Sequence, residues 1–289
     1  MLDSRVTELP KLAVTGATGH VGGAVARSLA ERGVEQRLVV RSPERAPELT
    51  GAVVRGCSYG DRPAAEAALQ GVETLFMVSG SESADRLDQH FTFVDAAAAA
   101  GVRQIVYTSF VNAAPDAIFT LVRDHYATEQ RIIAGGMAYT FLRDNFYLDF
   151  MELFAGEQGV IAGPADDGRV GMVARADVAR SATAVLLDPE AHAGTTYTLT
   201  GPESLTLTEA AERLTTARGR PFRFHNETLA EAYASRASYN APDWQVEAWV
   251  TTYTAIAAGQ LDVVTDHVER LTGRRAISLA EHLAGGTAR

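Results

Sequence analysis

Short runs of β-branched and other apolar residues alternate with longer amphipathic stretches through the first half of the chain. The short runs predict strands, and the amphipathic stretches predict helices that pack on them. The predicted strands are Lys11–Val14, Gln36–Val40, Ala52–Arg55, Thr74–Val78, Gln104–Tyr107 and Tyr139–Leu142. The predicted helices lie near His20–Arg32, Pro43–Leu49, Arg62–Leu69, Ser83–Ala100 and Thr120–Ala134. Such alternation requires crossover connections, so we predict an α/β fold: a Rossmann-type, doubly wound parallel sheet with helices on both faces.

Four glycines directly follow predicted helices. Helices often end at a residue with a left-handed backbone, a conformation that glycine adopts without a steric penalty. We therefore expect a helix to end at each of Gly33, Gly71, Gly101 and Gly135.

The pattern changes after Phe150. The stretch "GVIAGPADDGRVGMV" predicts two short strands interrupted by glycine, and "ADVARSATAVLLD" predicts a helix capped by Asp177 or a near neighbour. The run "TTYTLTG" predicts another strand. In the helix predicted after it, Thr206 and Glu209 have the spacing of a capping box.

Glycine is concentrated where the first predicted strand meets the first predicted helix, in "VTGATGHVGG". Three of these glycines form the pattern G-x-x-G-x-x-G. The first would allow a sharp turn, the second would let a pyrophosphate approach the backbone at the helix N-terminus, and the third would let the helix pack closely on the strand. The predicted phosphate-binding residues are Gly16, Thr18, Gly19, His20, Val21 and Gly22. A tight turn without a ligand is the alternative.

The end of the second predicted strand indicates which dinucleotide binds. Sites for NAD usually place Asp or Glu there to bind the ribose hydroxyls, whereas this chain has Arg41, with Arg45 shortly after it. Arginine cannot accept hydrogen bonds from hydroxyls, but its guanidinium suits a 2′-phosphate. The sequence therefore favours NADP(H) over NAD(H); the alternative is two solvated surface arginines.

These features divide the chain into two expected units. We expect an NADP-binding Rossmann domain at residues 1–150. A smaller, substrate-binding α/β lobe is expected at residues 151–289, with some of its segments returning to the core sheet.

Composition narrows the range of partners. The 289 residues carry a formal net charge of -10 and contain no cluster of Lys and Arg, which argues against nucleic acid. No apolar run approaches the ~20 residues that a bilayer span needs, and the polar N-terminus lacks the apolar core of a secretory signal. The single cysteine, Cys57, excludes an internal disulfide and a cysteine-based metal cluster. We expect a cytoplasmic monomer or homodimer with no metal and no membrane partner.

Longer segments carry a family resemblance. The chain resembles the NmrA-like group of atypical short-chain dehydrogenases/reductases, and within it the type 2 NAD(P)H:quinone oxidoreductases and the triphenylmethane reductases. The likeness extends roughly from Leu12 to Leu283. The segments that carry it include "VTGATGHVGGAV", "VVRSPERA", "AAAAAGVRQIVYTSF", "DHYATEQRI", "YTFLRDNFYLDF" and "YTLTGPESLTLTEAA".

The resemblance implies an NADP-binding core, a small C-terminal lobe and a substrate cleft between them. It also implies that two further segments lie beside the cofactor and its nicotinamide. The residues concerned are Val78, Ser79, Gly80, Thr108 and Ser109.

Two positions depart from the family pattern. An acidic residue often follows the third strand in the family, whereas this chain has Ser58 there. The sequence "LRN" of close relatives reads "LRD" here, ending at Asp144, with an asparagine one position later at Asn145. Both departures concern individual contacts and leave the predicted fold unchanged.

Candidate catalytic groups are few. Typical short-chain dehydrogenases use Tyr-x-x-x-Lys, but here Tyr126 is followed at that spacing by Gln130. The neighbouring pair His125 and Glu129 is spaced i, i+4 on one helix face, so Glu129 could favour a protonated imidazole that donates a proton to substrate. The alternative is a structural pair. Tyr147 is a second candidate donor, although it could equally be a packing residue.

The absence of a strong base suggests an acceptor that takes hydride readily, such as a quinone. We therefore expect an NADPH-dependent reductase that transfers hydride to a quinone or a similar conjugated aromatic acceptor. The alternatives are an NADP(H)-binding redox sensor without turnover and a biosynthetic reductase for one phenolic or polyketide-like intermediate. An apolar aromatic surface would suit such an acceptor. Four aromatic residues fit one helix face at spacings of three and four: Phe146, Tyr147, Phe150 and Phe154. The alternative is that these rings are ordinary core packing. The candidate substrate-binding residues are Asn145, Phe146, Tyr147 and Phe150.

Overall fold

A parallel sheet with strand order β3-β2-β1-β4-β5-β6-β9 forms the centre of the molecule. The computed structural model describes residues 9–285 and confirms the predicted α/β fold. The strands are β1 (Leu12–Thr15), β2 (Gln36–Val40), β3 (Ala52–Gly56), β4 (Thr74–Met77), β5 (Gln104–Phe110), β6 (Ala138–Asp144) and β9 (Thr195–Leu199). The chain order reverses between β1 and β4. In open parallel sheets, ligands bind beyond the carboxyl ends of the strands at such a point.

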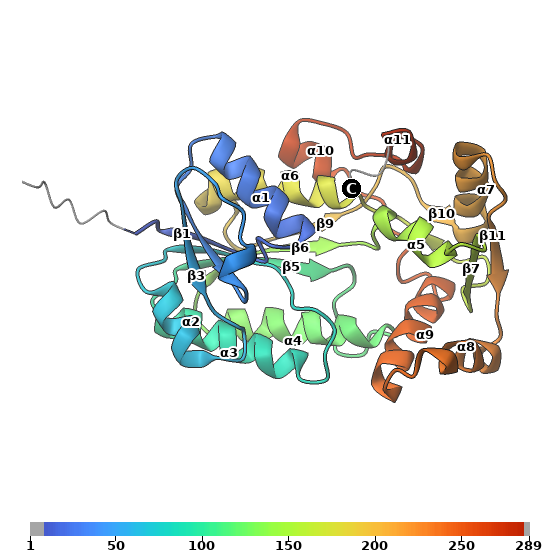
Figure 1. The fold of residues 1–289 in the computed structure, drawn as a ribbon, viewed down its shortest axis with the longest axis horizontal. Coiled ribbons are helices and arrows are strands. Elements are labelled where there is room, and N and C mark those ends of the chain that lie inside the picture. Colours follow the sequence, from blue (N-terminus) through green and yellow to red (C-terminus); the bar gives the residue numbers. More distant parts are fainter. Residues whose placement is uncertain (1–8, 286–289) are drawn as a thin grey trace, which may run out of the picture.

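Helices cover both faces of this sheet. Figure 1 shows α1 (His20–Glu31) and α6 (Arg175–Leu187) over one face. The other face is covered by α2 (Arg62–Leu69), α3 (Arg86–Ala99) and α4 (Thr120–Ala134). Segments from beyond residue 150 therefore contribute a helix, α6, and an edge strand, β9, to the layered unit.

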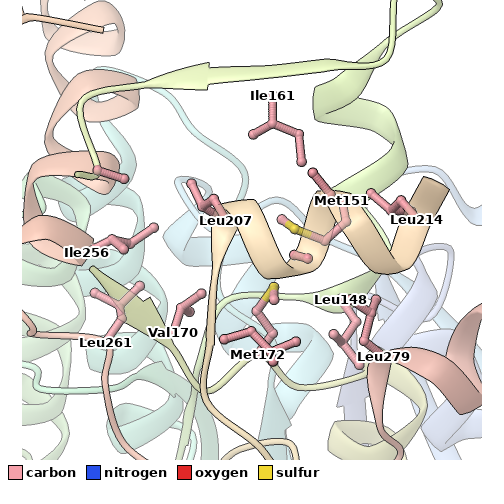
Figure 2. Close-up of a cluster of buried hydrophobic side chains, with 14 of the residues drawn as sticks. Leu148, Met151, Ile161, Val170, Met172, Leu207, Leu214, Ile256, Leu261 and Leu279 are labelled. Carbon is pink, nitrogen blue, oxygen red and sulfur yellow. The ribbon is translucent and has the colours of Figure 1, made fainter. Parts of the chain in front are cut away.

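A smaller lobe lies beyond the carboxyl ends of β5 and β6 (Figure 1). In it, β7 (Val160–Gly163) pairs with β11 (Arg223–Asn226), and β8 (Arg169–Val170) pairs with β10 (Leu205–Thr206). Its apolar core brings Met151, Ile161 and Leu207 together (Figure 2). The remaining α-helices of the described residues are α5 (Met151–Ala155), α7 (Leu207–Arg218), α8 (Leu229–Arg236), α9 (Asp243–Ala257), α10 (His267–Thr272) and α11 (Leu279–Ala284). Of these, α10 packs on α6 and β9 of the layered unit. None of the helices within residues 9–285 is long and apolar enough to cross a membrane.

The helix predicted at Pro43–Leu49 is wrong. Only a single 3-10 turn forms, at Pro43–Arg45, and Ala46 after it is extended, with ψ at 141°. Ala46 precedes Pro47, and the proline ring disfavours helical backbone at the residue before it.

Two predicted helix ends also need correction. The left-handed residue after α4 is Gly136, with φ at +75°, whereas Gly135 has helical backbone. The residue that caps α6 is Ala174. Asp177 lies buried in the first turn, where its carboxylate accepts a hydrogen bond from the backbone of Ile277 and pairs with Arg180. By contrast, the capping box of Thr206 and Glu209 at the start of α7 is confirmed.

Candidate active site

The glycine-rich turn joins β1 to α1 with very little space around it. Gly16 has φ at +65°, and its carbonyl oxygen accepts from the Gly19 amide at 2.8 Å. A Cβ on Gly22 would lie 2.4 Å from the Gly16 oxygen and 2.5 Å from the Thr15 oxygen, so only glycine fits. The close packing of α1 on β1 thus depends on this residue.

The N-terminus of α1 is open to an anion. Gly19 is the N-cap residue of α1 and offers no side chain to accept from the first amides of the helix. Thr18, Gly19 and His20 are exposed. Free amides at a helix N-terminus bind phosphate groups, so the turn fits the diphosphate of a dinucleotide.

Two guanidinium groups follow β2 at the same end of the sheet. Arg41 comes directly after the last residue of the strand, Arg45 ends the 3-10 turn, and both side chains are exposed. Because β2 is the neighbour of β1, these cations and the glycine turn occupy adjacent strand ends. This placement suits a further phosphate on the ribose next to the turn.

The segment Val78–Gly80 follows β4 and contacts the glycine turn. A Cβ on Gly16 would lie 3.1 Å from the Cβ of Val78. The Ser79 amide donates to the buried hydroxyl of Thr108 on β5, at 2.8 Å. Thr108 and Ser109 lie inside β5, because that strand extends to Phe110 rather than ending at Tyr107. The structure therefore places the predicted cofactor-binding segments of β1, β4 and β5 together at the carboxyl ends of these neighbouring strands.

The predicted contact between Glu129 and His125 is wrong. The Glu129 carboxylate instead accepts from the Ser109 hydroxyl, at 2.6 Å, and binds the Arg143 guanidinium through both oxygens, at 2.9 and 2.6 Å. Ser109 and Arg143 come from β5 and β6, so Glu129 ties α4 to the sheet. Ser109 is thereby a sheet residue whose hydroxyl binds a buried carboxylate.

His125 is held by two other groups. An Arg86 nitrogen lies 3.0 Å from Nε2, and the Tyr107 hydroxyl lies 3.0 Å from Nδ1. Since a guanidinium only donates, Nε2 must accept and Nδ1 must carry the hydrogen. Burial, together with the nearby Arg86 charge, lowers the pKa of His125 well below its usual value. The geometry thus favours a neutral imidazole that links elements and argues against the protonated form predicted from the sequence.

Tyr147 has a partner that sequence reasoning missed. Its hydroxyl donates to Asp144 Oδ2 at 2.7 Å, while Asp144 Oδ1 is buried and without a partner among residues 9–285. Burial raises the pKa of Asp144 to about 8, and burial beside Asp144 also raises the pKa of Tyr147. The only signal for Asp144 in the sequence was its departure from the "LRN" pattern.

The predicted aromatic residues form a cluster. The ring centroids of Phe146 and Phe154 are 5.5 Å apart, and those of Phe150 and Phe154 are 5.7 Å apart. The Tyr147 ring lies 5.7 Å from that of Phe150. The rings do not come from one helix face as predicted, because Phe146 and Tyr147 precede the 3-10 turn that ends at Phe150. Phe154 is 40% exposed, so the cluster is partly open to solvent.

Asn145 binds the backbone next to this cluster. It is fully buried, its amide nitrogen donates to the Leu261 carbonyl at 3.0 Å, and its oxygen accepts from the Phe146 amide at 2.7 Å. Asn145 therefore joins the end of β6 to the segment after α9.

Known proteins are similar to this chain along almost its whole length. The chain is 34% identical to quinone oxidoreductase 2 of Escherichia coli (strain K12), over 94% of this chain and 97% of that protein. The structure of an NADPH-dependent quinone oxidoreductase from E. coli complexed with NADPH matches with a TM-score of 0.87 at 33% identity, covering 95% and 99% of the two chains.

Two further relatives are also named as reductases. NAD(P)H azoreductase of Xenophilus azovorans is 30% identical over 93% of this chain and 95% of that protein. The Citrobacter sp. triphenylmethane reductase, solved with NADP(H), has a TM-score of 0.84 at 31% identity and covers 95% and 99% of the two chains. The predicted family resemblance is therefore confirmed.

The model of a protein family described as NAD(P)H-binding also matches this chain, and the match begins in the glycine turn. It covers residues 16–189, more than half of the chain, and includes the segments after β2, β4, β5 and β6 described above. Together with relatives aligned over nearly all of its length, this match shows that the chain belongs to the NAD(P)H-binding family.

Proposed function

We propose that the protein is an NADPH-dependent reductase of quinone-like acceptors. The observation that carries this proposal is the glycine turn, in which only glycine fits at position 22 and the first amides of α1 have no capping side chain. Relatives at 30% identity or more, named as quinone and azo reductases, support the same class of reaction.

In this proposal, residues at the carboxyl ends of the strands bind different parts of the cofactor. The turn from Gly16 to Gly22 binds the diphosphate, and Arg41 and Arg45 bind the 2′-phosphate. Val78–Gly80 and Thr108 form the wall beside the rest of the cofactor. The bound nicotinamide supplies the hydride.

The chain itself has to supply a surface for the acceptor and a proton. We propose the partly open aromatic cluster of Phe146, Phe150 and Phe154 as the surface on which a flat acceptor packs. Tyr147 borders this cluster, and its partner Asp144 is mostly protonated at neutral pH. In the proposed step the Asp144 carboxyl turns its own hydrogen toward the Tyr147 oxygen, the Tyr147 hydrogen passes to the acceptor, and the Asp144 proton replaces it. His125 and Glu129 are proposed to hold α4 against β5 and β6.

Steady-state oxidation of NADPH with a panel of benzoquinones and naphthoquinones tests the proposal. We expect NADPH to be consumed in step with formation of the hydroquinone. If NADPH binds tightly but is not oxidised by any acceptor in the panel, the reductase proposal fails and a redox sensor is favoured.

The choice of NADPH has its own test in the variant Arg41→Asp. Removing the guanidinium and adding a carboxylate should raise the KM for NADPH at least about tenfold while changing the KM for NADH much less. Arg32→Asp, at the opposite end of α1, is the matched control and should affect both cofactors equally little. Equal effects of R41D on both cofactors would refute the assignment of Arg41.

A further inference from the structure

The backbone of Val78–Gly80 is bound by buried or partly buried side chains of several other elements. All three of its amides have side-chain acceptors, at 2.8–2.9 Å, and two of its carbonyl groups have side-chain donors, at 2.6 and 3.0 Å. The acceptors are Thr15, Thr108 and His90, and the donors are Tyr59 and Arg86. A three-residue loop segment with so many partners has little freedom left.

Of these partners, His90 is the one whose ability to accept a hydrogen bond depends on its protonation state. Its Nε2 accepts from the Gly80 amide at 2.8 Å, so Nδ1 carries the hydrogen and donates to Thr128 Oγ1 at 2.9 Å. Thr128 in turn donates to the Asp124 carbonyl at 2.7 Å. Burial, with the nearby Arg86 charge, lowers the pKa of His90 to about 3, so the ring stays neutral and remains an acceptor near neutral pH.

Arg86 binds the backbone of the same residue, Gly80, at its carbonyl group. Its three guanidinium nitrogens contact the Gly80 carbonyl, Asp124 Oδ2 and His125 Nε2, each at 3.0 Å. The Arg86 side chain is only 5% exposed. Gly80 is therefore held at its amide by His90 and at its carbonyl by Arg86, and both residues are anchored to α4.

From these contacts we propose that His90 and Arg86 are positioning residues, which fix Val78–Gly80 in the shape that the cofactor requires. This inference rests on the proposed function, since it is NADPH that would lie against the segment. A backbone that is already ordered loses no further conformational freedom when the ligand binds, so these two residues increase cofactor affinity without touching the cofactor.

The variant His90→Phe tests the inference by removing the acceptor and leaving the Gly80 amide unpaired. We expect the Kd for NADPH, measured by calorimetry, to rise about tenfold, with a parallel rise in the KM for NADPH and no change in the KM for the quinone. His90→Gln places an oxygen near the position of Nε2 and should restore most of the affinity.

His267 provides a matched control. Its Nδ1 accepts from the Thr198 amide at 2.9 Å, which is the same kind of bond made between α10 and β9. His267→Phe should lower the melting temperature without altering the Kd for NADPH by more than about twofold. Should H90F not fold, Thr128→Val, which removes the acceptor for His90 Nδ1, is expected to raise the Kd about threefold.

The outcomes separate the two proposals. If the wild type binds NADPH and H90F or T128V binds it no more weakly than H267F does, the positioning role is overturned while the proposed function stands. If the wild type itself does not bind NADPH, both are overturned.

Discussion

At the carboxyl ends of the strands, burial affects the protonation of single residues as much as their hydrogen-bond partners do. Asp144 is 2% exposed, and only one of its oxygens has a hydrogen-bond donor among residues 9–285. A carboxylic acid in such surroundings is costly to ionise. Burial accordingly raises the pKa of Asp144 to about 8, so the group is mostly protonated at neutral pH.

Replacing Asp144 by Asn should change how stability depends on pH. The unfolded chain loses the Asp144 proton near its ordinary pKa of about 4, whereas the native protein keeps it until about pH 8. The native state therefore binds more protons across this window, and the free energy of unfolding must fall as pH rises, by at most about 1.4 kcal/mol per pH unit. Urea unfolding at about pH 5 and about pH 7.5 measures this fall. Parallel pH profiles for the wild type and D144N would contradict the prediction.

The pair His125 and Glu129 shows what spacing alone can and cannot predict. The i, i+4 spacing correctly placed both residues on α4, and both are buried against the sheet. Their partners, however, come from other elements: Arg86 from α3 and Arg143 from β6. A stronger partner brought in by the fold outcompetes a helical neighbour, and a single sequence does not show which partner that will be.

At the scale of elements, the position of α1 follows from the glycines at its start. The spacing of the glycines in the sequence was sufficient to predict this turn, because each has a separate steric reason. The helix predicted after β2 does not form beyond Arg45, because Pro47 disfavours helical backbone at Ala46. Local steric effects, such as those of the turn glycines and of Pro47, can thus be predicted from the sequence alone.

The variant Gly22→Ala tests how closely α1 must approach the turn. The new methyl group would meet the Gly16 oxygen at 2.4 Å, so α1 has to move away from β1. We expect a loss of about 1–3 kcal/mol in the free energy of unfolding, together with a rise of at least about tenfold in the Kd for NADPH. Thermal unfolding and calorimetry measure the two effects.

Gly33→Ala is the control for that variant. Gly33 has φ at +72°, but a Cβ there would meet nothing within 4 Å. It should cost about 1 kcal/mol of stability and leave the Kd for NADPH unchanged. A G22A protein that binds NADPH as well as G33A does would show that the close approach is not needed for the cofactor.

At the scale of the whole molecule, α9 connects the two lobes. Its Gln245 and Trp249 both donate to Glu82 Oε2, in the segment after β4, at 3.0 and 3.3 Å. Further along, the Thr120 amide at the start of α4 donates to Thr251 at 3.3 Å. Alternating strands and helices predicted the sheet from the sequence, but these contacts join residues more than 130 positions apart, and no pattern along the chain indicates them.

Glu82→Ala removes one anchor between the lobes. Because the contacts are exposed, we expect the free energy of unfolding to change by less than about 1 kcal/mol. The first turns of α9 lose their link to the segment after β4, so their amide hydrogens should exchange faster, and the KM for the quinone should rise about threefold while the Kd for NADPH stays the same. Hydrogen-exchange mass spectrometry and steady-state kinetics measure these effects. Glu66→Ala removes an exposed carboxylate that pairs with Arg62 on α2, and it should alter neither quantity. If E82A and E66A exchange equally slowly in α9 and share one KM for the quinone, the Glu82 contacts contribute neither to the stability of α9 nor to binding of the quinone.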